Sequence, residues 1–173
     1  MGEEVLVDRA RRGDSAALEE LFRRSYPVLK GFLVRLTLDE DLAEEIAQET
    51  MLRALLHLGG YRPEARFSTW LAAIALNLWR NTRRRAGRIV PWDEVPEPAA
   101  ADDPAEAAVQ WEIRSLLTAL PPEKRLVLVL KHYEDLTYEE IAAMLRCPIG
   151  TVRSRLHDGI AILRREVRRR GLL

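Results

Sequence analysis

The chain has 173 residues, of which 47% are hydrophobic and 31% charged, a composition typical of a globular protein. No apolar run approaches the ~20 residues of a membrane-spanning helix, and the acidic N-terminus lacks a secretory pattern, so we expect a cytoplasmic protein without membrane insertion. One cysteine excludes an internal disulfide, and no metal-ligand spacing, phosphate loop or hydrolase motif is present, so we expect no metal, no cofactor and no enzyme.

The formal net charge of zero hides three electrically different segments. Residues 1–90 carry a net charge of +2, residues 91–107 carry −6, and residues 108–173 carry +4. The middle segment has four prolines and six acids with no base, which is typical of a flexible linker. Its charge either keeps a simple tether solvated or has a function of its own. Apolar residues elsewhere recur at helical spacing, which predicts an all-α protein of two small helical domains, residues 1–90 and 108–173.

Residues that typically end or cap helices divide the first domain into four expected helices. Gly13 and Asp14 are expected to end a short first helix, with Asp14 as the N-cap of a second helix that Pro27 kinks. A third helix is expected from about residue 39 or 41 to residue 56, and a fourth from a cap at Ser68 to about residue 85. The second helix has an apolar stripe of Leu18, Leu21, Phe22, Leu29, Phe32, Leu33 and Leu36.

The third helix has two distinct faces. Its expected buried stripe consists of Ala43, Ile46, Ala47, Thr50, Met51, Ala54 and Leu55. Its outer face combines acids and an amide with large apolar groups, at Asp41, Glu45, Gln48, Glu49, Leu52 and Leu56. Solvated faces rarely carry leucines, which indicates a protein-binding surface. The alternative is that Leu52 or Leu56 packs under a neighbouring helix.

The fourth helix carries a basic stripe with amides, formed by Asn77, Arg80, Asn81, Arg84 and Arg88, to which Arg83 and Arg85 add charge. Such a stripe suits a phosphate backbone and splayed bases. Trp70 is expected in the core. Tyr61, in the loop before this helix, and Trp79 either stack on a base or have a structural role.

In the second domain, a first helix carries Val109, Ile113, Leu116, Leu117 and Leu120. Pro121 and Pro122 end it, and one of them can begin the next helix, which holds Leu126, Val127, Leu130 and Tyr133.

The sequence after residue 136 predicts a helix-turn-helix. Thr137 and Glu140 have the spacing of a capping box, and Pro148 prevents the first helix from continuing. Thr151 is expected to cap the second helix, whose buried positions are Val152, Leu156, Ile160 and Leu163. In this motif the second helix enters the major groove of DNA with its N-terminal residues. The exposed candidates are Thr151, Arg153, Ser154, Arg155 and His157.

A basic tail follows on the same helix, with Arg164, Arg165, Arg168, Arg169 and Arg170 available for contacts with the DNA backbone. The alternative is that the arginines form only the solvated face of a helical hairpin.

Three segments resemble the extracytoplasmic-function sigma factors of bacterial RNA polymerase, over about residues 8–90 and 108–168. DLAEEIAQETMLRAL is similar to the family's core-binding segment, and RFSTWLAAIALNLWRNTRRR to its promoter-melting helix. LPPEKRLVLVLKHYEDLTYEEIAAMLRCPIGTVRSRLH is similar to its C-terminal DNA-binding domain. Their order along the chain matches the family.

This resemblance implies roles for particular residues. The β′ clamp coiled coil of core polymerase would be bound by Asp41, Glu45, Gln48, Glu49, Leu52 and Arg53. The single-stranded minus-ten element would be contacted by the loop from Tyr61 to Phe67 and by Asn77, Arg80, Arg83 and Arg84. The C-terminal domain would lie on the β flap and place Arg153, Ser154 and Arg155 in the minus-thirty-five major groove.

The resemblance also implies that the linker follows the RNA exit path, that the polymerase makes all covalent bonds, and that an anti-sigma factor controls the protein. The sequence departs from the family at Asp158, Gly159 and Ile160, where basic residues are common, and at Asn81, where an acidic residue is common. Two other classes remain open, a stand-alone DNA-binding regulator and a protein adaptor.

Overall fold

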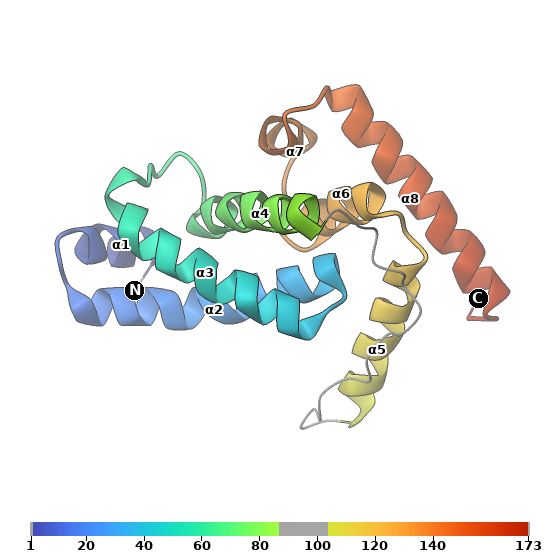
Figure 1. Cartoon of the computed structure of the whole chain (residues 1–173), viewed down its shortest axis with the longest axis horizontal. Coiled ribbons are helices and arrows are strands. Elements are labelled where there is room, and N and C mark those ends of the chain that lie inside the picture. Colours follow the sequence, from blue (N-terminus) through green and yellow to red (C-terminus); the bar gives the residue numbers. More distant parts are fainter. Residues whose placement is uncertain (1, 87–103, 173) are drawn as a thin grey trace. The chain divides into compact units, whose positions relative to one another are not determined.

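The computed structural model describes residues 2–86 and 104–172, and within them every regular element is a helix (Figure 1). This confirms the all-α prediction. The chain divides into two compact units, residues 1–34 with 40–89 and residues 35–39 with 90–173. The predicted linker, residues 91–107, lies outside the described residues except for its last four, which already belong to a helix.

The first unit begins with α1 (Glu3–Arg11) and α2 (Ser15–Thr37). Asp14 caps α2 as predicted, because its Oδ1 accepts a hydrogen bond of 3.0 Å from the backbone N–H of Ala17. That bond, together with the Arg9 guanidinium 2.6 Å away, lowers the pKa of Asp14. Gly13 makes the turn between the helices at a φ of +91°, which favours glycine.

Helix α2 continues on both sides of Pro27 to its end at Thr37. Of its predicted stripe, Leu18 and Phe22 are only half-buried. Its buried apolar positions are Ala17, Leu21, Leu29, Phe32, Leu33 and Leu36.

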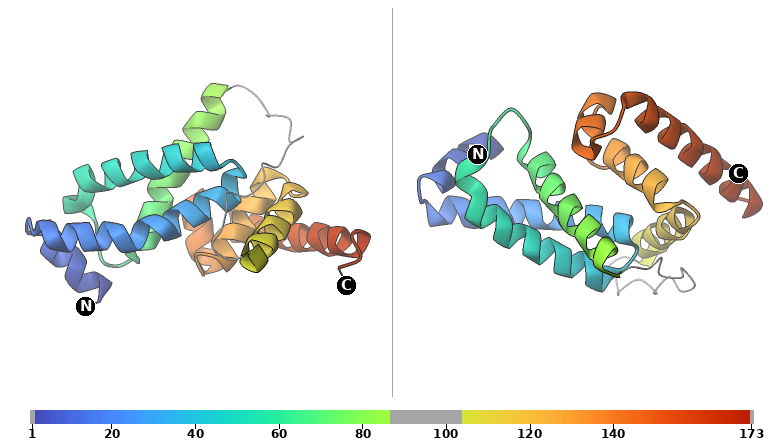
Figure 2. Two further views of the ribbon diagram at one scale, coloured as in Figure 1. Left: turned by 90° about the horizontal axis from the view of Figure 1, so that it is seen from below. Right: turned by 45° about the horizontal axis from the view of Figure 1, so that its top comes forward.

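Helix α3 (Glu40–His57) packs across α4 (Phe67–Ala86), and the 3-10 turn η1 (Leu58–Gly60) follows α3 (Figure 2). Small residues make up most of the buried face of α3, which lets another helix pack closely against it. The buried residues of α3 are Ala43, Ile46, Ala47, Thr50, Met51 and Ala54, and those of α4 include Leu71, Ala72, Ala75, Leu76 and Trp79. The Thr50 hydroxyl donates a 2.7 Å hydrogen bond to the carbonyl of Ile46, which satisfies this buried polar group.

Three predictions for this unit are wrong. Leu55 is 46% exposed instead of buried, because it faces a groove beside α2. Trp70 is half-buried rather than a full core residue. Helix α4 begins at Phe67 and not with a cap at Ser68.

The second unit contains α5 (Pro104–Thr118), α6 (Pro122–His132), α7 (Tyr138–Leu145) and α8 (Ile149–Arg169). Helix α8, at the red end of Figure 1, packs against α6, α7 and α5. Pro121 is the N-cap of α6 and Pro122 its first residue, as predicted. Buried Arg125 donates hydrogen bonds to the carbonyls of Leu117 (3.1 Å) and Leu120 (2.8 Å). These bonds provide partners for carbonyl groups at and just after the C-terminal end of α5.

Some apolar positions of this unit are more exposed than predicted. Val109 on α5 is 55% exposed, and Tyr133, just after α6, is 39% exposed. Ile160 and Leu163 are half-buried, because they border a groove between α6 and α8. Helix α8 begins at Ile149 with Pro148 as N-cap, so Thr151 lies in the first turn and does not cap the helix.

Candidate functional site

The helix-turn-helix of α7 and α8 is closed by local hydrogen bonds. The predicted capping box is present: the N–H of Thr137 donates to Glu140 Oε2 at 2.7 Å, and the N–H of Glu140 donates to Thr137 Oγ1 at 3.2 Å. Arg146 ends α7 in the left-handed conformation, with φ 52° and ψ 48°. Ile141, Ala142 and Leu145 on α7 and Val152 and Leu156 on α8 are buried. The motif therefore holds α8 in a fixed orientation relative to α7.

The predicted DNA-binding residues lie together on the first three turns of α8. Arg153, Ser154 and His157 are exposed, whereas Thr151 and Arg155 are half-buried. The Arg153 guanidinium carbon lies 5.6 Å from the centroid of the Tyr138 ring. Arg155 Nη1 lies 3.3 Å from Glu123 Oε2 of α6. Each arginine is thus oriented by a side chain from a neighbouring helix.

Asp158 forms an ion pair with α6 and is not an isolated charge on the DNA-binding helix. Lys124 Nζ lies 3.0 Å from Asp158 Oδ2, and this hydrogen bond lowers the pKa of Asp158. Gly159 is buried against the same part of α6, with Lys124 and Leu120 as the nearest side chains. These two departures from the family's basic pattern thus lie at the contact between α6 and α8.

The basic tail of α8 is partly neutralised within the unit. Glu166 pairs with Arg169 at 2.6 Å and with Arg170 at 2.7 Å, and the hydrogen bonds from these two arginines lower the pKa of Glu166 to about 2. Arg170 also donates to Ser115 Oγ on α5 at 2.6 Å. Arg164, Arg165 and Arg168 are exposed.

The outer face of α3 is accessible. Leu52 is 58% exposed and Leu56 78%, so neither packs under a neighbouring helix in the described structure. Among the charged residues of this face, Glu49 Oε1 lies 2.7 Å from Arg53 Nε. Asp41, Glu45 and Gln48 are exposed as well. All six residues predicted to bind polymerase therefore lie on one helix.

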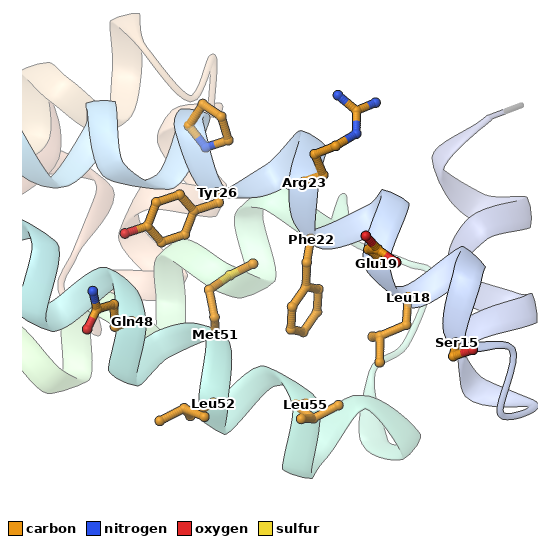
Figure 3. A pocket seen from close by; sticks show the side chains of 11 residues that line it. Ser15, Leu18, Glu19, Phe22, Arg23, Tyr26, Gln48, Met51, Leu52 and Leu55 are labelled. Atoms are coloured by element: carbon orange, nitrogen blue, oxygen red, sulfur yellow. The ribbon is translucent and has the colours of Figure 1, made fainter.

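An apolar groove of about 850 Å³ runs between α2 and α3, beside this face. Leu18 and Phe22 of α2 point toward Leu55 and Met51 of α3, and Leu52 borders the same groove (Figure 3). Helical periodicity places Leu18 and Phe22 on the apolar stripe of the second helix and Leu55 on the buried stripe of the third, so it does not reveal the groove. The signal that could have found it is the density of apolar residues on two faces of α3, more than one buried stripe requires.

A polar cluster ties α2 to α3 at one end of the groove. Glu44 accepts hydrogen bonds from the Tyr26 hydroxyl and, at 2.8 Å, from Gln48 Nε2, and Lys30 Nζ lies 2.5 Å away. The hydrogen bonds from Lys30, Tyr26 and Gln48 lower the pKa of Glu44 to about 2. Burial and the bond to Glu44 raise the pKa of Tyr26 to about 12. This cluster fixes the orientation of Gln48, one of the six predicted polymerase contacts.

The loop before α4 is built around three aromatic rings. The Tyr61 ring lies 5.5 Å from Phe67 and 5.4 Å from Trp70 between centroids, both in edge-to-face geometry. The Tyr61 hydroxyl donates to the carbonyl of Ala65 at 2.6 Å. Tyr61 and Phe67 are buried, so here they shape the loop, while residues 62–66 are exposed. No sequence pattern singles out Arg62, which adds a positive charge to the exposed part of the loop.

The basic stripe of α4 is exposed at Asn77, Asn81, Arg83 and Arg84, and half-buried at Arg80. Arg83 lies over the ring of Trp79 at 4.8 Å, and Arg84 Nη2 donates to Asn81 Oδ1 at 3.1 Å. Trp79 is 5% exposed, which favours its structural role. Arg88 lies outside the described residues.

Two absences hold for the described part of the chain. None of its helices combines the length and apolar character that crossing a membrane requires. Residues 2–86 and 104–172 contain no group of three or more His, Cys, Asp or Glu side chains that could hold a metal ion.

Comparison with known families gives two matches. Residues 21–89 match the family described as Sigma-70 region 2, and residues 110–163 match Sigma-70, region 4. The RNA polymerase sigma-H factor of Pseudomonas aeruginosa is 34% identical and aligns over 89% of this chain and 88% of its own length. The ECF RNA polymerase sigma-E factor of Escherichia coli is 30% identical over 89% of this chain and 88% of its own length.

Solved structures share the fold. One is the sigma factor RpoE in complex with the anti-sigma factor NepR from Bartonella quintana, with a TM-score of 0.73, 22% identity, and 87% of this chain and 96% of that chain covered. Another is CnrH in complex with the cytosolic domain of CnrY, with a TM-score of 0.68, 24% identity, and 95% and 96% covered.

Proposed function

This chain belongs to the extracytoplasmic-function sigma factors of bacterial RNA polymerase, and we propose that its two units recognise separate promoter elements. As a sigma factor, it is a transcription initiation factor that directs core polymerase to specific promoters. Residues 1–90 would bind core polymerase and the minus-ten element, and residues 108–173 the minus-thirty-five element. The observation that carries this assignment most directly is the helix-turn-helix, closed by its capping box, with Arg153 and Ser154 exposed on α8.

Core polymerase would bind the α3 face through its β′ clamp coiled coil, with contacts from Asp41, Glu45, Gln48, Glu49, Leu52 and Arg53. The exposure of Leu52 and the open groove beside it support this proposal, because binding a partner would remove that apolar surface from water. The charged residues around Leu52 would form the polar rim of the interface.

Single-stranded minus-ten DNA would lie along α4 and the loop before it. Asn77, Arg80, Arg83 and Arg84 would contact the strand and nearby phosphates, and the loop from Tyr61 to Phe67 would hold a flipped base. The exposure of residues 62–66 around a rigid aromatic cluster supports this role, because a fixed loop can form a pocket of constant shape.

Duplex minus-thirty-five DNA would receive the N-terminal part of α8 in its major groove, with Thr151, Arg153, Ser154, Arg155 and His157 as contact residues. The β flap of the polymerase would bind the second unit as well. A groove of about 560 Å³ between α6 and α8, bordered by Leu128, Ile160, Leu163 and Val167, is a suitable apolar surface.

The remaining proposals concern regulation and location. The protein would act in the cytoplasm, where the polymerase works, and would itself have no catalytic residue, since the polymerase makes every bond. Two structures with this fold were solved as complexes, one explicitly with an anti-sigma factor, which supports an anti-sigma partner for this chain too. The acidic residues 91–107 would follow the RNA exit path.

Run-off transcription tests the proposed function. Core polymerase with the full chain should initiate at defined sites, and sequencing of the transcripts should show two shared promoter elements upstream of them. The opposite result, binding of duplex DNA by the chain alone with no specific initiation by the polymerase, would favour the stand-alone regulator.

A further inference from the structure

Helix α1 contacts both ends of the loop that precedes α4. The Arg11 guanidinium donates through Nη2 to the carbonyl of Gly59 at 3.1 Å, just before the loop. At the other end, the N–H of Phe67 donates to Glu3 Oε1 at 3.0 Å. The two contacts join residues that are 48 and 64 positions apart in sequence. They are therefore tertiary contacts made by one short helix.

The contact of Glu3 replaces an N-terminal cap. Phe67 is the first residue of α4, and its N–H is one of the groups that have no partner inside the helix. The residue before it, Arg66, has no side-chain acceptor. The Glu3 carboxylate supplies one and places a negative charge at the positive end of the helix dipole. This explains why α4 begins before Ser68.

Helix α1 is a fixed platform for these two contacts. Its residues Leu6, Val7 and Ala10 are buried, so the helix is held by the core of the unit. Glu3 and Arg11 are eight positions apart, which separates their Cα atoms by about 12 Å along a helix. Residues 62–66 lie between the two anchored points and are exposed.

We propose that α1 supports the loop from Tyr61 to Phe67, with Glu3 and Arg11 as positioning residues. They hold the two ends of the loop at a fixed spacing. A base that flips out of the DNA strand therefore binds to a loop that is already ordered. Both positioning residues lie on α1, outside residues 21–89 that match Sigma-70 region 2. The inference rests on the proposed function, namely that this loop binds the minus-ten strand.

Binding of a single-stranded oligonucleotide by the holoenzyme tests the proposal. The probe is the non-template minus-ten strand of a promoter mapped by run-off transcription. Glu3→Ala and Arg11→Ala together should weaken its binding by about 5- to 10-fold, the scale of one lost base contact. Affinity for core polymerase should be unchanged, because the α3 face does not involve α1.

Conservative variants separate positioning from general damage. Glu3→Gln keeps an oxygen acceptor for the N–H of Phe67 and should bind the oligonucleotide within about twofold of wild type, as expected for a retained hydrogen bond. Glu4→Ala is the matched control, because it removes the same charge from the neighbouring exposed position. Hydrogen exchange of the Phe67 amide should accelerate in Glu3→Ala and not in Glu4→Ala.

Three results would overturn the inference. They are unchanged oligonucleotide binding in the double variant, a loss of core affinity that accompanies the loss of oligonucleotide binding, and a failure of Glu3→Gln to keep binding near the wild-type value. Arg80→Ala and Arg84→Ala in the same assay report on the proposed function itself. If these two weaken binding and the α1 variants do not, only the positioning role is wrong. If none of them weakens binding, the minus-ten assignment is wrong.

Discussion

Arg155 on α8 forms an ion pair with Glu123 in the first turn of α6, with 3.3 Å between Nη1 and Oε2. The Arg155 side chain is 31% exposed and that of Glu123 56%. Because both side chains reach solvent, the pair contributes only about 0–1 kcal/mol, and a phosphate or a guanine can displace the carboxylate. The pair orients Arg155 before DNA arrives and places an anion close to the DNA-binding surface.

Neutralising Glu123 should therefore strengthen DNA binding. We expect Glu123→Gln to raise the affinity of holoenzyme for promoter DNA by about 2- to 5-fold at low salt, because one negative charge near the phosphates is removed. The gain should shrink as salt is added, as measured by binding titrations at several salt concentrations. Glu112→Gln on α5 removes the same charge elsewhere in the unit and serves as control. A weaker affinity in Glu123→Gln would mean that the pair preorganises Arg155 more than it repels DNA.

Removal of either arginine from α8 should impair promoter selection. Arg153→Ala and Arg155→Ala should each weaken promoter binding by about 1–3 kcal/mol, the scale of one base contact, and so reduce promoter-specific initiation. Affinity for core polymerase should stay at the wild-type value, because these residues lie outside the α3 face. Run-off yield and core binding are measured in parallel. Arg165→Ala, which removes an exposed arginine farther along α8, should act more weakly and equally at all promoters.

Changes on the outer face of α3 should have the opposite effect: they should weaken core polymerase binding and leave the DNA contacts of α8 intact. Glu49→Lys should weaken core polymerase binding, because it reverses a charge on the rim and sets a lysine beside Arg53. Leu52→Ala should cost about 1–3 kcal/mol of binding free energy if Leu52 becomes buried in the interface. Equilibrium binding of labelled chain to core polymerase measures both.

Val109→Ala, at an equally exposed apolar position on α5, is the control for Leu52→Ala. Unchanged affinity in both Glu49→Lys and Leu52→Ala would show that the docking face lies elsewhere.

Features that depend on neighbours in sequence were predictable. Asp14, Pro122 and the pair of Thr137 with Glu140 act within three or four residues, so their spacing alone identified the helix starts. The order of the helices and the helix-turn-helix follow from such local signals. Family resemblance then supplied candidate site residues that periodicity alone could not assign.

Features that depend on distant contacts were not predictable. The first N–H of α4, at Phe67, donates to Glu3, 64 residues away in sequence, so the nearby Ser68 was a misleading signal. Leu55 has the spacing of a core residue, and only the separation of α2 from α3 leaves it on a groove. Tyr61 is buried because Phe67 and Trp70 surround it, which no pattern in a loop reveals. A single sequence gives the faces of helices, whereas tertiary packing decides which faces are covered.

Gly159 offers a test of the contact between α6 and α8. A Cβ placed at this helical position would lie 3.6 Å from Lys124 Cβ and 3.8 Å from Leu120 Cδ2, which are ordinary van der Waals distances. Gly159→Ala should therefore raise the free energy of unfolding by about 0.5–1 kcal/mol, because alanine loses less backbone entropy in a helix. Denaturant unfolding followed by circular dichroism measures it. Gly13→Ala is the contrasting control and should destabilise, since Gly13 has a φ of +91°.

The Tyr26–Glu44 pair predicts how stability depends on pH. The pKa of Glu44 is lowered from 4.5 to about 2 in the folded chain, so the unfolded chain binds this proton more readily. Its contribution is therefore present above pH 4.5 and is lost as the pH falls toward 2. Tyr26 acts at the other end, because its pKa is raised from 10 to about 12 and its contribution is lost as the pH rises through that range.

A plot of the free energy of unfolding against pH should have an acid limb and an alkaline limb. Replacement of either partner should flatten one of them. Denaturant unfolding at a series of pH values should show a shallower acid limb for Glu44→Gln and a shallower alkaline limb for Tyr26→Phe. Glu45→Gln, an exposed neighbour on α3, is the control and should leave both limbs as in wild type. An acid limb in Glu44→Gln as steep as in wild type would show that other carboxylates, such as Glu166 with its pKa of about 2, dominate the acid response. The same unfolding series on Glu166→Gln then assigns the remaining slope to the second unit.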